Sequence, residues 1–364
     1  MLPWAPLALT TVTAVLLALP VTPALYELWK RGDASALPTS RHDGRITNFA
    51  DVLRTRLEPL RPQLECCRSE REVSRTALAG MEILLVGTDN FDFDSRQIQG
   101  ISTLMFGDVA QIPAGKVVDA DVYADGPIEL GEGAALRAAL GRDDIILGKN
   151  SSVLRWLHGE GNVYLRPGST AYGRLSAGQS IRLERGCAFQ HMHAPQILTV
   201  DSDDTRALPT SDAHVCQAQK DSEEKAERLV TGDMFTSSRP RLRVEGDFVL
   251  PAGETLNANV IATGELHIGR GARLLGSAKS YRDTVIDEDA CVHGSIVCGG
   301  TLWLGPRTFA LGPVMAEFDV LIARGARVGE PDAPTTISSS GANISAGCQL
   351  HGTVWARVRG SVEA

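Results

Sequence analysis

The chain has 364 residues, enough for two or three domains, and its 44 acidic and 36 basic side chains give a formal net charge of −8. Charges of both signs are spread along the sequence without a basic run, which argues against a nucleic-acid partner. Aromatic residues make up only 5 % of the chain whereas glycine occurs 36 times, so a large globular enzyme core is disfavoured and thin, repeated turns are favoured.

The first predicted element is a membrane anchor within residues 1–29. Residues 2–26 carry no charged side chain, and this run can cross a hydrocarbon core of about 30 Å as a helix. No Lys or Arg precedes the run, and four follow it: Lys30, Arg31, Arg41 and Arg45. A cleaved signal peptide would need a basic stretch before the run, so we expect a retained single-pass transmembrane helix with the bulk of the chain in the cytoplasm.

Residues 30–82 are predicted to form a juxtamembrane linker followed by a short helix. Apolar residues at helical spacing occupy Phe49, Leu53, Leu57, Leu60 and Leu64, with Pro59 and Pro62 interrupting the helix. We expect this helix to pack on the body of the protein, because five apolar positions do not sustain a coiled-coil seam. A self-association helix is the alternative.

The seven cysteines are odd in number and form no CxxC pair, so neither a zinc site nor a disulfide framework is indicated. Scattered free thiols favour a reducing compartment. Cys66 and Cys67 are adjacent in a charged stretch. They could be palmitoylated close to the membrane, but the simpler interpretation is that they are two thiols without a special role.

Residues 83–106 contain β-like runs that begin the next domain. The segment "DNFDFD" alternates Asp89, Asp92 and Asp94 with phenylalanines and lacks the Gly and distal Glu of a calcium loop. It is therefore predicted to be a strand with a wet, acidic face. Because the end of a stack of strands must be covered or paired, residues 83–106 are expected to cap it unless the end self-assembles.

Most of the remaining sequence is a repeat of about 18 residues. The phrase "LHIGRG" at 266–271 recurs as "VLIARG" at 320–325. Turn residues follow at steps of 18, with one step of 17: Gly115, Gly133, Asn150, Gly168 and Gly186, then Gly253, Gly271, Asp289, Arg307 and Gly325. Three strands of six residues make one coil of a triangular parallel β-helix, whose neighbouring coils pair at roughly 4.8 Å. A glycine that recurs in this way marks a corner and not a phosphate-binding loop.

The repeat itself is duplicated. "IPAGKVVDADVYADGPIELGEGAAL" from Ile112 aligns with "LPAGETLNANVIATGELHIGRGARL" from Leu250 at an offset of 138, which becomes 139 further on. We therefore expect an all-β protein with a first β-helix block at 83–200, a polar linker at 201–240 and a second block at 241–364. A single coil cannot bury its own inner face, so only the stack is stable. The spacing does not set the handedness.

The second block resembles the bactofilins, polymer-forming cytoskeletal proteins of bacteria. The resemblance covers about 240–330 and lies in "GELHIGRGARLLGSAKSYRDTVIDEDACVHGSIVCGGTLWLGPRTFALGPV". It consists of the spacing of the repeat and the placement of its glycines. It implies a right-handed triangular β-helix whose ends stack into filaments without nucleotide at the inner membrane, as a scaffold for cell-envelope or polysaccharide machinery. The duplicated block and the long N-terminal region depart from the family's single block between tails, which leaves a capped scaffold as the alternative to a filament.

A hexapeptide-repeat acyltransferase is the rival interpretation, because that class also uses coils of 18 residues. It needs a general-base histidine beside an acyl-CoA site. His191 and His193 in "FQHMHAP" share a strand face and could bind a metal, but no carboxylate or Cys has obvious ligand spacing to them, and the nearby Cys187 with two histidines is a weak ligand set. The sequence therefore predicts no catalytic residue, no cofactor and no metal site, and favours a scaffold that self-associates.

Overall fold

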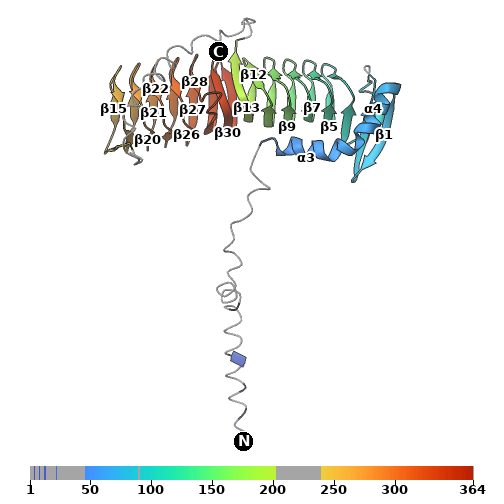
Figure 1. Cartoon of the computed structure of the whole chain (residues 1–364), viewed down its shortest axis with the longest axis horizontal. Helices are drawn as coiled ribbons and strands as arrows, with labels where there is room; N and C mark the ends of the chain where they lie inside the picture. The colour runs from blue at the N-terminus through green and yellow to red at the C-terminus, as the bar shows by residue number, and fades with distance from the viewer. Residues whose placement is uncertain are drawn as a thin grey trace, which may run out of the picture. The chain divides into compact units, whose positions relative to one another are not determined.

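The computed structural model describes residues 46–88, 91–201 and 239–363, together with a few isolated positions before residue 46. These residues form an all-β parallel solenoid of about 13 turns with about 18 residues per turn, as predicted (Figure 1). Residues 1–45 are a separate unit by their contacts. The anchor expected at 2–26 and the linker between 202 and 238 lie outside the described residues. Among the residues that the structure describes, no helix is long and apolar enough to cross a membrane.

The helix predicted before the solenoid is present and is interrupted near both prolines. It consists of α3 (Asn48–Leu57), the 3-10 turn η3 (Glu58–Leu60) and α4 (Arg61–Glu70). Pro59 and Pro62 lie in the first turn of η3 and α4, where the missing backbone N–H removes no helical hydrogen bond. The chain thus bends at these points without losing the apolar stripe that packs on the solenoid.

Block 1 begins with an antiparallel hairpin and continues as parallel coils. Its strands are β1 (Val73–Leu78), β2 (Met81–Val86), β3 (Thr103–Phe106), β4 (Ala110–Ile112), β5 (Val117–Ala124), β6 (Ile128–Leu130), β7 (Ala135–Gly141), β8 (Ile145–Leu147), β9 (Ser152–Gly159), β10 (Val163–Leu165), β11 (Thr170–Ala177), β12 (Ser180–Glu184) and β13 (Ala188–Val200). A short 3-10 turn, η4 (Arg96–Ile98), lies between β2 and β3. Strands β1 and β2 pair antiparallel, and from β2 onward each strand pairs in parallel with its equivalent one coil later.

Block 2 repeats this arrangement with shorter strands. They are β14 (Arg241–Val244), β15 (Phe248–Leu250), β16 (Thr255–Leu256), β17 (Asn259–Ala262), β18 (Leu266–Ile268), β19 (Arg273–Leu274), β20 (Ala278–Ser280), β21 (Thr284–Ile286), β22 (Cys291–Val292), β23 (Ile296–Cys298), β24 (Leu302–Leu304), β25 (Phe309–Ala310), β26 (Val314–Ala316), β27 (Asp319–Ile322), β28 (Arg327–Val328), β29 (Thr335–Ser345) and β30 (Gln349–Glu363). Ile268 pairs with Ile286 and Ile286 with Leu304, all buried. The period-2 alternation places such residues inside, where a narrow aliphatic core forms.

The corners of the coils explain the recurring turn residues. All ten predicted corner positions have positive φ, including Gly271 at +64° and Asp289 at +60°. This left-handed conformation is open to glycine and is tolerated by Asp and Asn. Gly269 has a different role, since a Cβ there would lie 2.7 Å from the backbone nitrogen of Ala252 in the neighbouring coil. Both glycines of the motif therefore serve the fold.

The two blocks meet at their C-terminal coils. Strand β13 pairs antiparallel with β30, which joins the blocks into one stack with these strands side by side in its middle (Figure 1). Met192 faces Val354 inside the core, and His351 Nδ1 lies 2.8 Å from the carbonyl oxygen of Pro195 across the junction. The duplicated blocks are thus arranged tail to tail, which leaves their first coils at the two ends of the stack.

Candidate assembly interface

One face of block 1 is covered by the helices. Their buried side chains repeat at steps of three and four residues: Ala50, Leu53, Leu57, Leu60, Leu64 and Cys67. They pack on an outward column of block 1 that includes Met105, Tyr123 and Leu140. Phe49, predicted as a core position, is instead 46 % exposed and lies under the guanidinium of Arg174 at 4.2 Å. The expected packing of the helix on the body is confirmed.

The first coil of block 1 is closed by aromatic side chains. Phe91 and Phe93 are 5.0 Å apart between ring centroids, and both contact Phe106 at the end of the core. The prediction of an acidic strand here was wrong: residues 91–94 form a loop, and Asp89 lies outside the described residues. The two phenylalanines alternate with polar residues as they would in a strand, but here their rings cap the end of the core. Packing both rings over the core outweighs strand pairing.

The first coil of block 2 has no comparable cover among the described residues. Inward-facing Leu242 is 39 % exposed, whereas Val260, its partner one coil further on, is 1 % exposed. Phe248 is half-buried above the buried Leu266 in the same way. Within the described chain β14 pairs only with β17, so one edge of β14 retains free backbone donors and acceptors. Such an edge is a template for pairing with another strand.

The open edge also carries fixed charges of both signs. Arg241 and Arg243 in β14, and Glu245 directly after it, alternate with the inward residues Leu242 and Val244, in the order R-L-R-V-E. All three charged side chains are exposed, and none makes an ion pair with another described residue. The edge is therefore polar on its outer side and apolar on its inner side, like the strands already paired within the stack.

The two histidines considered as metal ligands lie on one strand face of β13, as predicted, but have separate partners. The His191 ring packs edge-on against Trp355 at 4.5 Å, and His193 Nδ1 lies 2.9 Å from Thr353 Oγ1. Cys187 points into the core, where its Sγ donates to the carbonyl oxygen of Arg166. No group of three potential ligands that could hold a metal ion occurs in the described part of the chain.

Other histidines bridge neighbouring coils. His158 is buried under α3, with Nδ1 2.8 Å from Ser176 Oγ, and burial lowers its pKa with a smaller contribution from Arg54. His267 Nε2 lies 2.8 Å from Asp287 Oδ2 on the surface of block 2, a histidine–carboxylate contact within the described part of the chain. His42 and His214 lie outside the described residues.

The structure separates the vicinal cysteines. Cys67 is buried against the solenoid, whereas Cys66, the preceding residue of α4, is exposed. The carboxylate of Glu70 raises the pKa of the Cys66 thiol, and burial raises that of Cys67. Both thiols are thus held in their less nucleophilic, protonated form.

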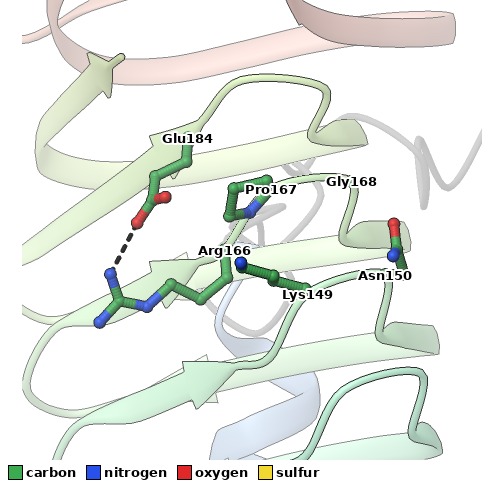
Figure 2. A pocket seen from close by; sticks show the side chains of 6 residues that line it. All are labelled: Lys149, Asn150, Arg166, Pro167, Gly168 and Glu184. Carbon is green, nitrogen blue, oxygen red and sulfur yellow. Dashed lines mark hydrogen bonds and ion pairs between the residues drawn. The ribbon is translucent and has the colours of Figure 1, made fainter. Parts of the chain in front are cut away.

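A depression at one corner of block 1 spans three coils, with a volume of about 530 Å³ (Figure 2). Its lining residues are Lys149, Asn150, Arg166, Pro167, Gly168 and Glu184. Arg166 Nη1 lies 2.7 Å from Glu184 Oε1. One of the two cationic side chains that line the depression is therefore already paired. The carboxylate of the lining, Glu184, is engaged in this ion pair, and Lys149 is the remaining charged side chain, which makes the depression a weak candidate for chemistry.

No protein-family model, curated protein or solved structure matches this chain. The open end of block 2 and the tail-to-tail junction are the features that sequence reasoning missed. The junction is marked in the structure by the long strands Ala188–Val200 and Gln349–Glu363 at the ends of both blocks, which the repeat pattern did not predict. The candidate functional site is therefore the first coil of block 2, whose outer edge has no partner among the described residues.

Proposed function

We propose that this chain is a bactofilin-like scaffold, anchored in the bacterial inner membrane by residues 2–26, that presents a rigid β-solenoid to cell-envelope or polysaccharide machinery. The observation that carries this proposal is the uncovered first coil of block 2, where Leu242 is 39 % exposed at the end of an otherwise buried column. A rod with an unpaired strand edge is suited to joining other rods or partners by strand addition.

The side chains support a structural role further. Described histidines such as His193 and His158 are engaged with hydroxyl groups one coil away, which stabilises the stack laterally. The helices cover one face of block 1 and begin at Asn48, shortly after the boundary at Arg45 of the unit that contains the proposed anchor.

The proposal is tested by membrane flotation and by partner capture in cells. The full chain is expected to float with inner-membrane vesicles, and deletion of residues 2–26 is expected to release the protein into the soluble fraction. A full-length protein that stays soluble, or a reporter fused after Ala364 that is active only in the periplasm, would contradict the membrane-anchored cytoplasmic scaffold. Saturable acyl-CoA binding that a His267→Ala change abolishes would instead support the acyltransferase.

A further inference from the structure

We propose that the open end of block 2 is closed by the same end of a second copy, so that the chain forms a two-fold dimer and not a filament. The proposal rests on the self-association part of the proposed function and names its partner and its stoichiometry. The surface concerned is the edge of β14 with the half-buried core residues next to it.

The first step is that this end needs a cover. Leu242, Phe248 and Leu256 occupy inward positions, yet all three are partly exposed, whereas their partners one coil further on are at most 1 % exposed: Val260, Leu266 and Leu274. Water satisfies the free backbone groups of the edge while the end is exposed, but a cover that cannot pair with them would leave them buried and unsatisfied. A cover must therefore supply both apolar contact and a strand edge.

The second step is that the end of another solenoid meets both requirements. The internal junction shows the geometry, because β13 and β30 pair antiparallel with Met192 opposite Val354 inside and His191 opposite Trp355 outside. The triangular cross-sections of two blocks thus match across one antiparallel strand pair. Two copies of β14 related by a two-fold axis would repeat this contact, with inward residues again opposite inward residues.

The third step is the charge pattern of β14, which fits its own two-fold copy. When the axis passes through Arg243, Arg241 of each copy lies opposite Glu245 of the other, and Leu242 lies opposite Val244. Two opposite-charge cross-strand pairs then flank a single Arg243–Arg243 contact at the solvent-exposed centre, where salt screens the repulsion. A one-residue slip would turn the leucine outward, so the register is specified by burial as well as by charge.

The fourth step is that assembly stops at two. The opposite end of the stack is closed by Phe91 and Phe93 over Phe106. Beyond β2 lies the antiparallel strand β1, whose exposed Ser74 and Arg75 interrupt its apolar residues, with Arg75 paired to Glu82. Polar and charged side chains of this kind disfavour further pairing at a strand edge. The C-terminal ends of both blocks are already used against each other at the junction. An isologous contact through the remaining end is closed, so it generates a dimer and leaves no end for growth.

The test is the mass of the full chain in detergent, measured by sedimentation and by native mass spectrometry over a range of concentrations. The expected species is a dimer. Leu242→Asp places two carboxylates in the apolar interface and is expected to weaken the dimer by at least ~100-fold. Val249→Asp is the matched control, because Val249 lies on the same coil but is 58 % exposed and points outward, and it is expected to leave the dimer unchanged.

A charge reversal tests the register independently of folding. Arg241→Glu or Glu245→Arg alone opposes like charges at two symmetric positions and is expected to weaken the dimer roughly 10-fold. The double variant R241E/E245R restores opposite charges and is expected to restore the affinity. A double variant as weak as the single variants would overturn the proposed register.

Two stoichiometries would overturn the dimer. Filaments of the native chain would show that an end assigned here as closed is available, while leaving the scaffold function intact. A monomer at all concentrations would show that the end is covered from within the chain. The flotation experiment is independent of both results, so failure of the membrane-anchored scaffold is distinguished from failure of the dimer.

Discussion

The same face of the solenoid is covered in block 1 and open in block 2. The residues of block 1 under the helices are Met105, Tyr123 and Leu140, and their equivalents in the duplicated sequence are Arg243, Ile261 and Lys279. The first three are at most 3 % exposed, whereas both basic residues of the second set are exposed. The two blocks thus share the same pattern of inward-facing residues. They differ in one column of outward-facing residues, which is apolar under the helices in block 1 and carries basic residues in block 2.

This difference separates two layers of information in the repeat. The inward positions and corners set the coil and are shared by both blocks, because a coil without them cannot stack. The outward positions are free to vary, so they decide which face binds the helices and which face stays in water. The first coils of the two blocks also differ in their covering residues. Phenylalanines close the end of block 1, whereas the end of block 2 has a strand of alternating charged and apolar residues and no cover among the described residues.

The largest expected effect follows from giving block 1 the outer residue of block 2. Leu140→Lys would bury an unpaired ammonium under the helices at a fully buried position, and is expected to lower the free energy of unfolding by about 4 kcal/mol. Hydrogen exchange should show α3 and α4 losing protection before the solenoid does. The reciprocal Lys279→Leu, on the open face, is expected to change stability by less than ~0.5 kcal/mol. Equal effects of the two changes would contradict the distinction between the faces.

The two ends of the stack give the next contrast. Phe93→Ala removes a 6 % exposed ring from the aromatic cap and is expected to cost about 3 kcal/mol, with fraying of β2 and β3 visible in hydrogen exchange. Phe248→Ala at the open end, measured at a concentration where the protein is monomeric, is expected to cost only about 1 kcal/mol because its ring is half-exposed. A larger loss for Phe248 than for Phe93 in the monomer would show that the open end is covered from within the chain.

The helix-covered face should also respond to pH. Burial lowers the pKa of His158 below its ordinary value, so the unfolded chain binds a proton before the folded one does. Its stability contribution is therefore complete above the ordinary histidine pKa of about 6.5 and is lost as the pH falls below that value. Arg54, Asp51, Glu160 and His193 are the charged or titratable groups around it.

His158→Gln is expected to flatten this pH dependence only in part, because burial lowers the pKa of His191 and His193 in the same direction. Denaturant unfolding between pH 7.5 and 5 measures the difference between the native chain and the variant. Val297 occupies the equivalent position of block 2, so Val297→Gln serves as the control and should leave the slope unchanged. A native chain whose stability rises on acidification would show that His158 gains rather than loses by protonation.

The sequence was sufficient for the solenoid because its determinants are periodic and local. Every predicted corner, from Gly115 to Gly325, has positive φ, and the helix that begins near Phe49 packs as expected. The aromatic cap was misread because Phe91 and Phe93 alternate like strand residues, and alternation alone does not distinguish pairing from covering an end. The antiparallel junction between β13 and β30 was missed because it joins surfaces 160 residues apart.

The candidate site was hidden from the sequence for a related reason. The R-L-R-V-E pattern from Arg241 to Glu245 reads as an ordinary amphipathic strand. Only the stack shows that the strand lacks a partner on one side among the described residues. A site made by the end of a repeat depends on where the repeat stops, and this is a property of the assembled fold.

The smallest predicted effect tests the layer that the two blocks share. Gly133 and Gly271 occupy equivalent corners at φ of +67° and +64°, and a Cβ at either position would meet no atom within 4 Å. Alanine there is therefore strained only by its backbone conformation, and each of Gly133→Ala and Gly271→Ala is expected to cost about 1 kcal/mol. Denaturant unfolding of the two variants should give the same loss within ~0.3 kcal/mol. A clearly larger loss in one block would show that the corners, like the outer columns, have taken different roles since the duplication.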